Sequence, residues 1–260
     1  MPFVRWNRDL KGLPMKTILV VLAFALCAVS AVAQKAQEPT PPSYCNPCLF
    51  YGGDFDINGP YPNALGNQDA AGIAGYAVVY VPFAVPPNQT WTVAGLFSND
   101  MVTVGDIAPP EIEWSISTGI SQGNPGTVVA SGVTKASLAP TGRSWNGMNE
   151  YTALGHLNAD AVVTLTPGHY WMTAVPVCTS AGRDQCQGAR YYLSDVEDVP
   201  APRAKGFEST DESYFYSPAG GQSSYYVETG GPDGLCSQPG NGGGCDKFSA
   251  GLLGTATLDN

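Results

Sequence analysis

Alternating apolar and polar positions are the clearest feature of the chain, and the best example runs from Glu111 to Thr118. Ile112, Trp114 and Ile116 are apolar, whereas the residues between them are Glu or Ser. A period of two is typical of a strand with one face buried and the other exposed to water. We therefore predict a half-buried strand at 111–118.

Similar runs recur along the chain, separated by clusters of Pro, Gly, Asn and Ser, and apolar residues at helical spacing do not extend over three turns after residue 33. Many short strands with such turns predict an all-β fold, a β-sandwich or jelly roll with long Gly/Pro-rich loops. Tyr76 to Val85 is apolar on both faces, which predicts a central strand. The other predicted strands are Thr90 to Phe97, Thr127 to Val133, Ala161 to Thr166, His169 to Val177 and Phe248 to Leu258.

Residues 1–33 have the pattern of a secretory signal peptide. Four basic residues precede an apolar run from Thr17 to Ser30, and Ala31-Val32-Ala33 forms an A-x-A cleavage site before Gln34. The apolar run is shorter than the roughly 20 residues that a transmembrane helix needs. We expect cleavage after Ala33, export of the chain, and no membrane span in the mature protein.

The mature chain is predicted to form one domain with two flanking features. Residues 34–72 are rich in Pro, Gly and Asn and are expected to form an extended arm. Residues 73–260 are expected to form the β-sandwich, with an acidic loop insertion at about 194–247. The insertion contains two aromatic segments that we expect to be short strands, Tyr214-Phe215-Tyr216 and Tyr225-Tyr226-Val227.

The charge of the chain excludes some classes of partner. Only 13% of residues are charged and the net charge is −10; loss of residues 1–33 removes four basic residues and one acidic residue and brings it to −13. Nucleic acids and anionic membranes attract proteins through clustered Lys and Arg, and the sequence has no such cluster. We expect a folded, acidic, exported protein without a nucleic-acid partner.

Six of the seven cysteines follow the signal peptide and fall into three close pairs. Six cysteines allow 15 pairings, and we predict nearest-neighbour pairing because each pair closes a loop that is poor in apolar residues. A redox motif at the first pair is disfavoured, because Pro and Gly flank it where a thioredoxin-type site needs a strand and a helix. The predicted disulfides are Cys45–Cys48, Cys178–Cys186 and Cys236–Cys245.

Several short segments occur in a recognisable order: Phe83-Ala-Val-Pro-Pro, Trp91-Thr-Val-Ala-Gly-Leu, Trp114-Ser-Ile-Ser, Leu165-Thr-Pro-Gly-His-Tyr-Trp-Met172 and Tyr214-Phe-Tyr-Ser-Pro-Ala-Gly-Gly221. The order resembles that of secreted bacterial β-sandwich proteins of the PEP-CTERM and choice-of-anchor type, over roughly residues 76–258. The resemblance implies a bacterial source, secretion and a sandwich fold, but no catalytic residues. Leu258-Asp259-Asn260 differs from the sorting segment of that group, so we expect no surface anchor.

A cation site is suggested by Asp54-Phe-Asp56-Ile-Asn58-Gly59, which matches the first half of a calcium loop. Leu65 stands where an EF-hand has its bidentate Glu, which excludes a full EF-hand. We favour a plain Asx-rich turn over a calcium site. Calcium, held by Asp54, Asp56 and Asn58, is nevertheless the one cofactor that the sequence suggests.

Trp145 is the best candidate for ligand binding, because turn-forming residues surround it between Thr141 and Asn149 and predict a loop. An exposed aromatic ring beside Arg143, Asn146 and Asn149 could stack on a sugar while the polar side chains bind its hydroxyls. The alternative, which we favour, is that Trp145 folds back as a lid on the sandwich edge. The other tryptophans of the mature chain lie in alternating strands and are expected in the core: Trp91, Trp114 and Trp171.

No catalytic signature is present. The chain lacks the G-x-S-x-G motif of a Ser hydrolase, and His156 and His169 are expected to be core or edge residues of strands. Glu111 and Glu113 share a strand face at about 7 Å and are the one pair that could serve a glycosidase. We expect them to be a solvated strand face.

The sequence therefore favours a secreted, non-catalytic β-sandwich that binds carbohydrate or another extracellular surface component, or that has a structural role. The alternatives are a secreted hydrolase acting on polysaccharide and a subunit of an extracellular assembly formed by self-association.

Overall fold

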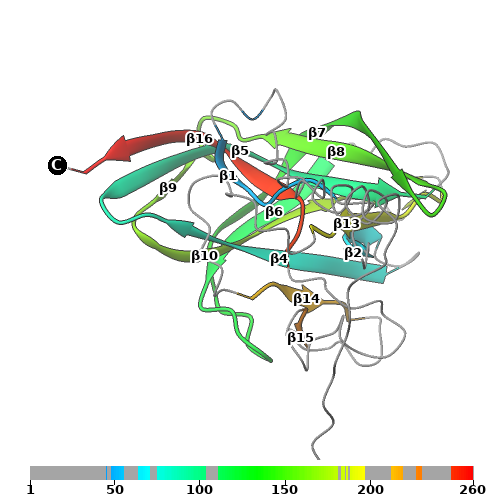
Figure 1. Ribbon diagram of the computed structural model, residues 1–260, viewed down its shortest axis with the longest axis horizontal. Helices are drawn as coiled ribbons and strands as arrows, with labels where there is room; N and C mark the ends of the chain where they lie inside the picture. The colour runs from blue at the N-terminus through cyan, green and yellow to red at the C-terminus, as the bar shows by residue number, and fades with distance from the viewer. Residues whose placement is uncertain are drawn as a thin grey trace, which may run out of the picture. The chain divides into compact units, whose positions relative to one another are not determined.

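All regular elements in the described part of the chain are β-strands, as the all-β prediction requires (Figure 1). The structure is a computed structural model that describes residues 45, 48–55, 64–70, 75–103, 111–180, 183–184, 186, 188–196, 212–218, 227–229 and 247–259. These residues belong to one compact unit, Glu38–Asn260. The predicted signal peptide, most of the acidic insertion and the residues Asp56, Asn58, Cys236 and Cys245 lie outside the described residues.

Strands within these ranges are numbered in chain order. They are β1 (Cys48–Tyr51), β2 (Ala64–Gly66), β3 (Gln68–Ala70), β4 (Gly75–Val85), β5 (Gln89–Val102), β6 (Glu111–Thr118), β7 (Thr127–Trp145), β8 (Met148–His156), β9 (Val163–Leu165), β10 (Gly168–Pro176), β11 (Thr179–Ser180), β12 (Arg183–Asp184), β13 (Tyr191–Ser194), β14 (Tyr214–Tyr216), β15 (Val227–Glu228) and β16 (Ala250–Leu258).

Antiparallel pairing joins 14 of these strands into one sheet, with the order β1-β16-β5-β8-β7-β6-β10-β4-β14-β15. The other four of the 14 strands lie outside this order: β13 and β9 pair with β5, β2 pairs with β13, and β3 pairs with β4. The remaining two strands, β11 and β12, pair with each other.

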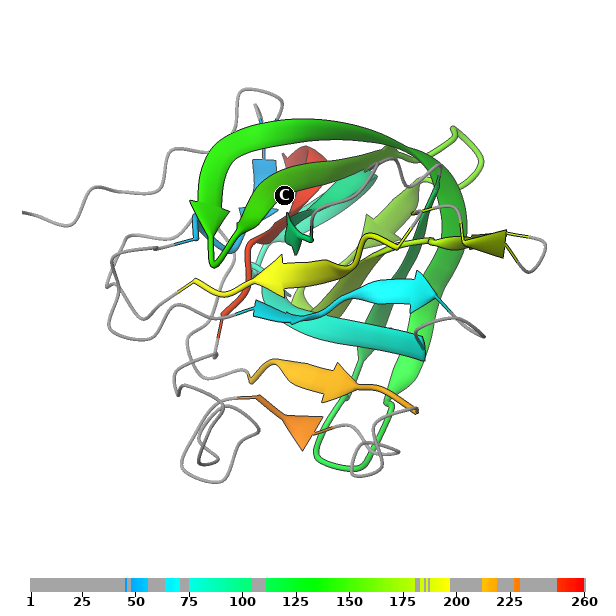
Figure 2. The ribbon, with the colours of Figure 1, turned by 90° about the vertical axis from the view of Figure 1, so that its right-hand side faces the viewer.

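The long strand β7 folds this sheet into two layers. Its first part, Thr127–Lys135, pairs with β6, whereas Ala136–Trp145 pairs with β8. Figure 2 shows β7, in green, sweeping around the side and over the top of the strands. We call the strands β6, β10, β4, β14 and β15 the first layer, and the strands β8, β5, β16, β1 and β13 the second layer. Such a folded sheet is compatible with the predicted sandwich or jelly roll.

Aromatic side chains fill the space between the layers. Phe83 of β4 lies 5.7 Å, between ring centroids, from Phe50 of β1 in the other layer. It also stacks on Trp91 at 6.1 Å and on Tyr170 at 5.6 Å. Aromatic pairs of this kind contribute stability beyond the area that they bury. They mark the centre of the main core.

The predicted strands are present with few changes. The strand at 111–118 has the predicted bounds, and β4 is central, because it pairs with β10, β14 and β3. Trp91, Trp114 and Trp171 are buried, which confirms their assignment to the core. Within the described residues there is no helix, and hence none that is long and apolar enough to cross a membrane.

The predicted N-terminal arm differs from expectation, because its described part is more than an extended wrap. It supplies β1 to the edge of the sheet beside β16, and β2 and β3 to pairs with β13 and β4. The arm is therefore part of the sheet as well as a cover for it.

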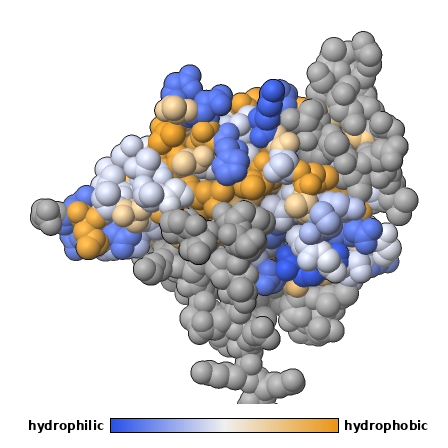
Figure 3. Space-filling model, turned by 90° about the horizontal axis from the view of Figure 1, so that it is seen from above, coloured by the Kyte–Doolittle hydropathy of each residue, from blue (hydrophilic) through white to orange (hydrophobic). Residues whose placement is uncertain are grey.

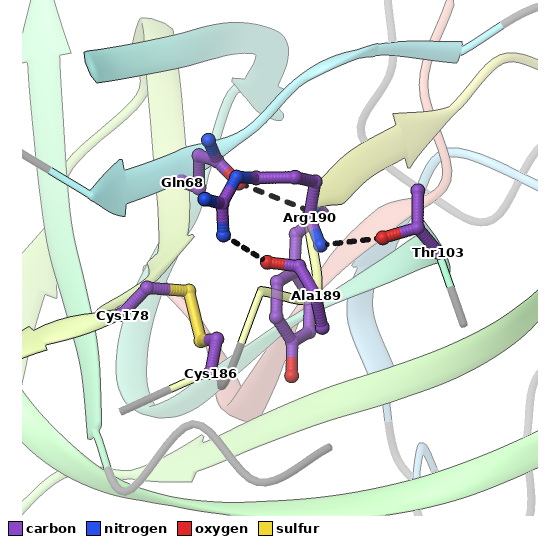
Figure 4. The surroundings of a disulfide bond; sticks show 7 residues. Gln68, Thr103, Cys178, Cys186, Ala189 and Arg190 are labelled. Carbon is purple, nitrogen blue, oxygen red and sulfur yellow. Dashed lines mark hydrogen bonds between the residues drawn. A yellow bond between two sulfur atoms is a disulfide. The ribbon is translucent and has the colours of Figure 1, made fainter. Parts of the chain in front are cut away.

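Two of the three predicted disulfides are present, Cys45–Cys48 and Cys178–Cys186, with Cα–Cα distances of 4.6 and 5.0 Å. Figure 4 shows the Cys178–Cys186 disulfide and the nearby residue Arg190. The backbone N–H of Arg190 donates to Thr103 Oγ1 at 2.8 Å, and the side-chain Nη1 of Arg190 donates to the Ala189 carbonyl at 2.6 Å. The predicted pair Cys236–Cys245 lies outside the described residues.

Candidate functional site

The segment around Trp145 is a tight β-hairpin rather than the predicted loop. β7 continues to Trp145 and β8 begins at Met148, so the turn consists of Asn146 and Gly147 alone. Their φ angles are 48° and 77°. Two consecutive positive φ values in Asn-Gly are typical of a type I′ turn, whose twist matches that of the paired strands. Trp145 is therefore the last residue of β7, next to a well-defined turn and shortly after a shift in register between Pro140 and Ser144.

Arg143 links this hairpin to two carboxylates. Its Nε lies 2.5 Å from Glu150 Oε2 on β8, and its Nη1 lies 2.8 Å from Asp54 Oδ1 on the N-terminal arm. Thr141 Oγ1 also donates to Glu150 Oε2, at 2.6 Å. The Glu150 side chain is completely buried, whereas Asp54 is partly exposed. The buried partner makes this an ion pair that is costly to break.

We call Arg143, Glu150, Asp54, Thr141 and Tyr51 the Arg143 cluster. The pKa values within it follow from burial and from the ion pairs. Burial lowers the pKa of Arg143, but the carboxylates of Glu150 and Asp54 outweigh it, so the pKa is raised. For Tyr51, in contrast, burial raises the pKa. The Asp54 carboxylate, which accepts a hydrogen bond from the Tyr51 hydroxyl, raises the pKa further. Arg143 is therefore a permanent cation and Tyr51 a permanent neutral donor.

Polar and aromatic contacts hold the N-terminal arm against the outer face of the second layer. Ser249 Oγ donates to the Gly53 carbonyl at 2.5 Å, and the Phe55 ring centroid lies 6.1 Å from that of Trp145. Tyr51 packs on Phe97 of β5 at 5.8 Å. We call residues 51–55 the clamp segment. It contacts the hairpin twice, through the bond from Arg143 to Asp54 and through the contact between Phe55 and Trp145.

The close approach of the clamp segment depends on glycine. A Cβ at Gly52 would collide with the Phe248 backbone carbonyl, and Gly53 has a φ of 125°. Residues other than glycine rarely adopt that backbone conformation. The Gly-Gly pair lets the backbone lie against the start of β16.

The structure separates the predicted ligand-binding residues. Trp145 is half-buried and packs on Phe55, which supports the lid interpretation in part. Asn146 is exposed at the turn. Asn149 is exposed as well, but it pairs with Ser144, one position away from the Trp145–Met148 pair. Successive residues of a strand point to opposite faces, so Asn149 points away from the Trp145 face.

One contact could not be expected from the sequence. It joins Asp54, a candidate calcium ligand, to Arg143, a candidate sugar-binding residue, although 89 positions separate them. One carboxylate oxygen of Asp54 accepts from both Arg143 and Tyr51. Asp56 and Asn58 lie outside the described residues. Among the described residues, no group of three or more His, Cys, Asp or Glu could hold a metal ion.

The remaining candidate residues lie on other strands. Glu111 is exposed and Glu113 half-buried on the outer face of β6, and burial, followed by the charge of Asp69, raises the pKa of Glu113. His156 and His169 are exposed at the end of β8 and the start of β10. These residues lie on separate strands from the Arg143 cluster, apart from His156, which is at the far end of β8.

A second polar cluster, not predicted from the sequence, is buried between the layers around Asp100 of β5. Asp100 Oδ1 accepts from Asn67 Nδ2 at 2.9 Å, and Oδ2 accepts from Ser98 Oγ at 2.6 Å. Asp100 and Asn67 are completely buried. The available signal was Ser98-Asn99-Asp100 following the apolar Gly95-Leu96-Phe97, a polar run in the middle of a buried strand.

The comparisons supply no relative that would assign either cluster. No protein-family model, no curated protein and no solved structure matches the chain.

Proposed function

We propose that the mature chain is an exported, non-catalytic β-sandwich that binds extracellular carbohydrate at the tip of the β7–β8 hairpin. The observation that carries the proposal is the placement of Trp145, a half-buried residue whose ring contacts that of Phe55 and whose neighbour Asn146 is exposed. A fixed aromatic ring next to a polar side chain is the usual way to bind a pyranose. A rigid strand also lowers the entropic cost of binding.

Export is supported by the two disulfides, because disulfides form and persist in oxidising compartments. The signal-peptide pattern at 1–33 and the resemblance to secreted bacterial sandwich proteins agree with it.

The charges favour a neutral ligand. Arg143 Nε donates to Glu150 and its Nη1 donates to Asp54, so two carboxylates more than offset its single positive charge. The mature chain is strongly acidic, and like charges repel an anionic polymer. We therefore expect neutral polysaccharides to bind better than polymers of uronic acids.

The face of the molecule drawn in Figure 3 is mixed in hydropathy. Seen from above, the molecule shows apolar patches interspersed with polar side chains (Figure 3). Such a mixture is ordinary for a protein surface, so the choice of the hairpin tip as the binding site depends on Trp145.

A sedimentation assay tests the proposal. The mature chain, 34–260, is mixed with a panel of insoluble polysaccharides, neutral and acidic, and each supernatant is assayed for remaining protein and for reducing sugar. Binding without sugar release supports the proposal. Sugar release would instead favour a hydrolase, and neither binding nor release would favour a structural or assembly role.

A further inference from the structure

The segment 64–70 crosses from one layer of the sandwich to the other. β2 pairs with β13 of the second layer, and β3 pairs with β4 of the first. Asn67 lies between the two strands and is completely buried. Its Nδ2 donates to Asp100 Oδ1 on β5 and to the Ala174 carbonyl on β10, each at 2.9 Å. One amide group therefore joins the two layers.

The Asp100 carboxyl at this joint is surrounded mostly by neutral groups. Ser98 and Asn67 donate to it, Tyr151 of β8 is its cross-strand partner, and Tyr191 of β13 lies close enough to interact with its charge. The charged group that acts on Asp100 is the Glu150 carboxylate, which is also negative. A buried carboxylate with these neighbours is poorly stabilised.

Two buried oxygens near the joint have no hydrogen-bond partner: Asn67 Oδ1 and the Tyr191 hydroxyl oxygen. Both carboxyl oxygens of Asp100 already accept a hydrogen bond, and a protonated Asp100 carries one O–H donor whereas an ionised Asp100 carries none. Burial raises the pKa of Asp100 to about 7, although the hydrogen bonds from Ser98 and Asn67 oppose the increase. Burial, followed by the charge of Asp100, raises the pKa of Tyr191, which keeps the phenol neutral.

We propose that the buried joint around Asp100 and Asn67 is a proton-operated latch between the two layers, most stable when Asp100 is protonated. Ionisation weakens the joint, because it leaves between the layers a completely buried carboxylate that only the hydrogen bonds from Ser98 and Asn67 stabilise. The proposal is independent of carbohydrate binding, because it concerns the interior of the sandwich and none of the hairpin residues.

The direction of the pH effect follows from proton linkage. The folded chain binds the Asp100 proton more tightly than the unfolded chain, whose Asp has a pKa of about 3.9. The latch therefore contributes its full stability below about pH 4, loses it as the pH rises to about 7, and changes little above that. Because each pH unit in this interval changes the unfolding equilibrium constant about tenfold, the total change is on the order of a thousandfold.

Urea unfolding between pH 4 and pH 8 tests the latch with the variant Asp100→Asn, which is neutral at every pH. The unfolding constant of the wild type, divided by that of the variant, should rise about tenfold per unit up to about pH 7 and then level off. Ser98→Ala removes a hydrogen bond that lowers the pKa, so it should move the plateau to higher pH. A ratio that is constant across the range would overturn the proposal.

Glu113→Gln is the matched control. Burial raises the pKa of Glu113 too, but this carboxyl is half-buried on the outer face of β6. We expect its pH-dependent ratio to change much less than that of Asp100→Asn. An equal change would mean that Asp100 is not special, which contradicts the latch.

Hydrogen exchange of the wild type gives a second test that does not require Asp100→Asn to fold. The Asn67 amide donates to the Tyr191 carbonyl at 3.0 Å at the joint. Its protection, corrected for the intrinsic rate, should fall more between pH 5 and pH 8 than that of Ile116 in the β6–β10 pair. Equal loss of protection at both amides, or no loss, would contradict a latch at this position.

Discussion

Replacing Arg143 with Met removes the cation of the hairpin cluster and keeps most of the side chain's apolar length. The Glu150 carboxylate is completely buried and would lose its charged partner, leaving Thr141 as a donor to Oε2. Glu150 Oε1 already lacks a hydrogen-bond partner. Removing one partner of a buried ion pair typically costs about 3–5 kcal/mol. Arg143 is partly exposed, so we expect Arg143→Met to lower the free energy of unfolding by about 3 kcal/mol at pH 7.

Urea unfolding with a double-mutant cycle measures this effect. Glu150→Gln removes the buried charge, so the double variant Arg143→Met with Glu150→Gln should regain most of the stability that Arg143→Met loses. Asp54→Asn is the matched control: it removes the other carboxylate, which is partly exposed, and should cost about 1 kcal/mol or less. Equal small losses for Arg143→Met and Asp54→Asn would refute the claim that the Glu150 contact dominates the cluster.

Further predictions concern the turn, the disulfide, the core and the clamp segment. Gly147→Ala should cost about 1–2 kcal/mol by urea unfolding, because Gly147 has a φ of 77°; no loss would contradict the type I′ turn. Replacing Cys178 and Cys186 with Ser should cost about 2–3 kcal/mol, read as a melting temperature below that of the oxidised wild type; an unchanged melting temperature would contradict a stabilising disulfide at this position. Trp91→Ala should cost about 3–5 kcal/mol, since Trp91 is buried and stacked on Phe83; a loss under 1 kcal/mol would contradict its place in the core. Gly52→Ala should release the clamp segment, and limited proteolysis should then cut near residue 52 faster than in the wild type.

The strands were predictable where apolar and polar residues alternate. The pattern at Glu111–Thr118 gave the bounds of β6, because one face of that strand is buried and the other is not. The pattern at Thr127–Val133 indicated only the first part of β7. The rest, Thr134–Trp145, contains Ala, Ser, Gly and Pro in place of the Val residues of the first part, so it lacks the β-branched apolar positions that indicate a strand.

The candidate site was less predictable for a different reason. Thr141–Asn149 is rich in turn formers, yet Asn146-Gly147 forms the turn, while Ser144 and Trp145 pair with Asn149 and Met148. The other turn formers lie at a shift in register between Pro140 and Ser144, where Gly142 has a φ of 85°. The clamp contact between Asp54 and Arg143 depends on tertiary folding. Local sequence carries no information about contacts of that separation.

Buried polar residues show the same limit. Ser98-Asn99-Asp100 interrupts an apolar run, which could indicate either a strand end or a polar cluster inside a sheet. The structure shows the second, with Asn99 Nδ2 bonded to Ser249 Oγ on the outer face and Asp100 bonded to Asn67 in the interior. Opposite faces of one strand therefore serve two separate polar networks.

The proposed carbohydrate site depends on the half-buried Trp145, and binding isotherms of matched variants test this dependence. Wild type, Trp145→Ala and Leu258→Ala would be compared on the polysaccharide that retains most wild-type protein. Leu258 is the matched control: it is 77% exposed and pairs with Gln89, at the opposite end of β5 from the hairpin. Loss of one stacked aromatic ring is worth roughly 1 kcal/mol, so Trp145→Ala should weaken binding about fivefold and Leu258→Ala should leave it unchanged. Equal affinity for all three proteins would contradict the proposed site.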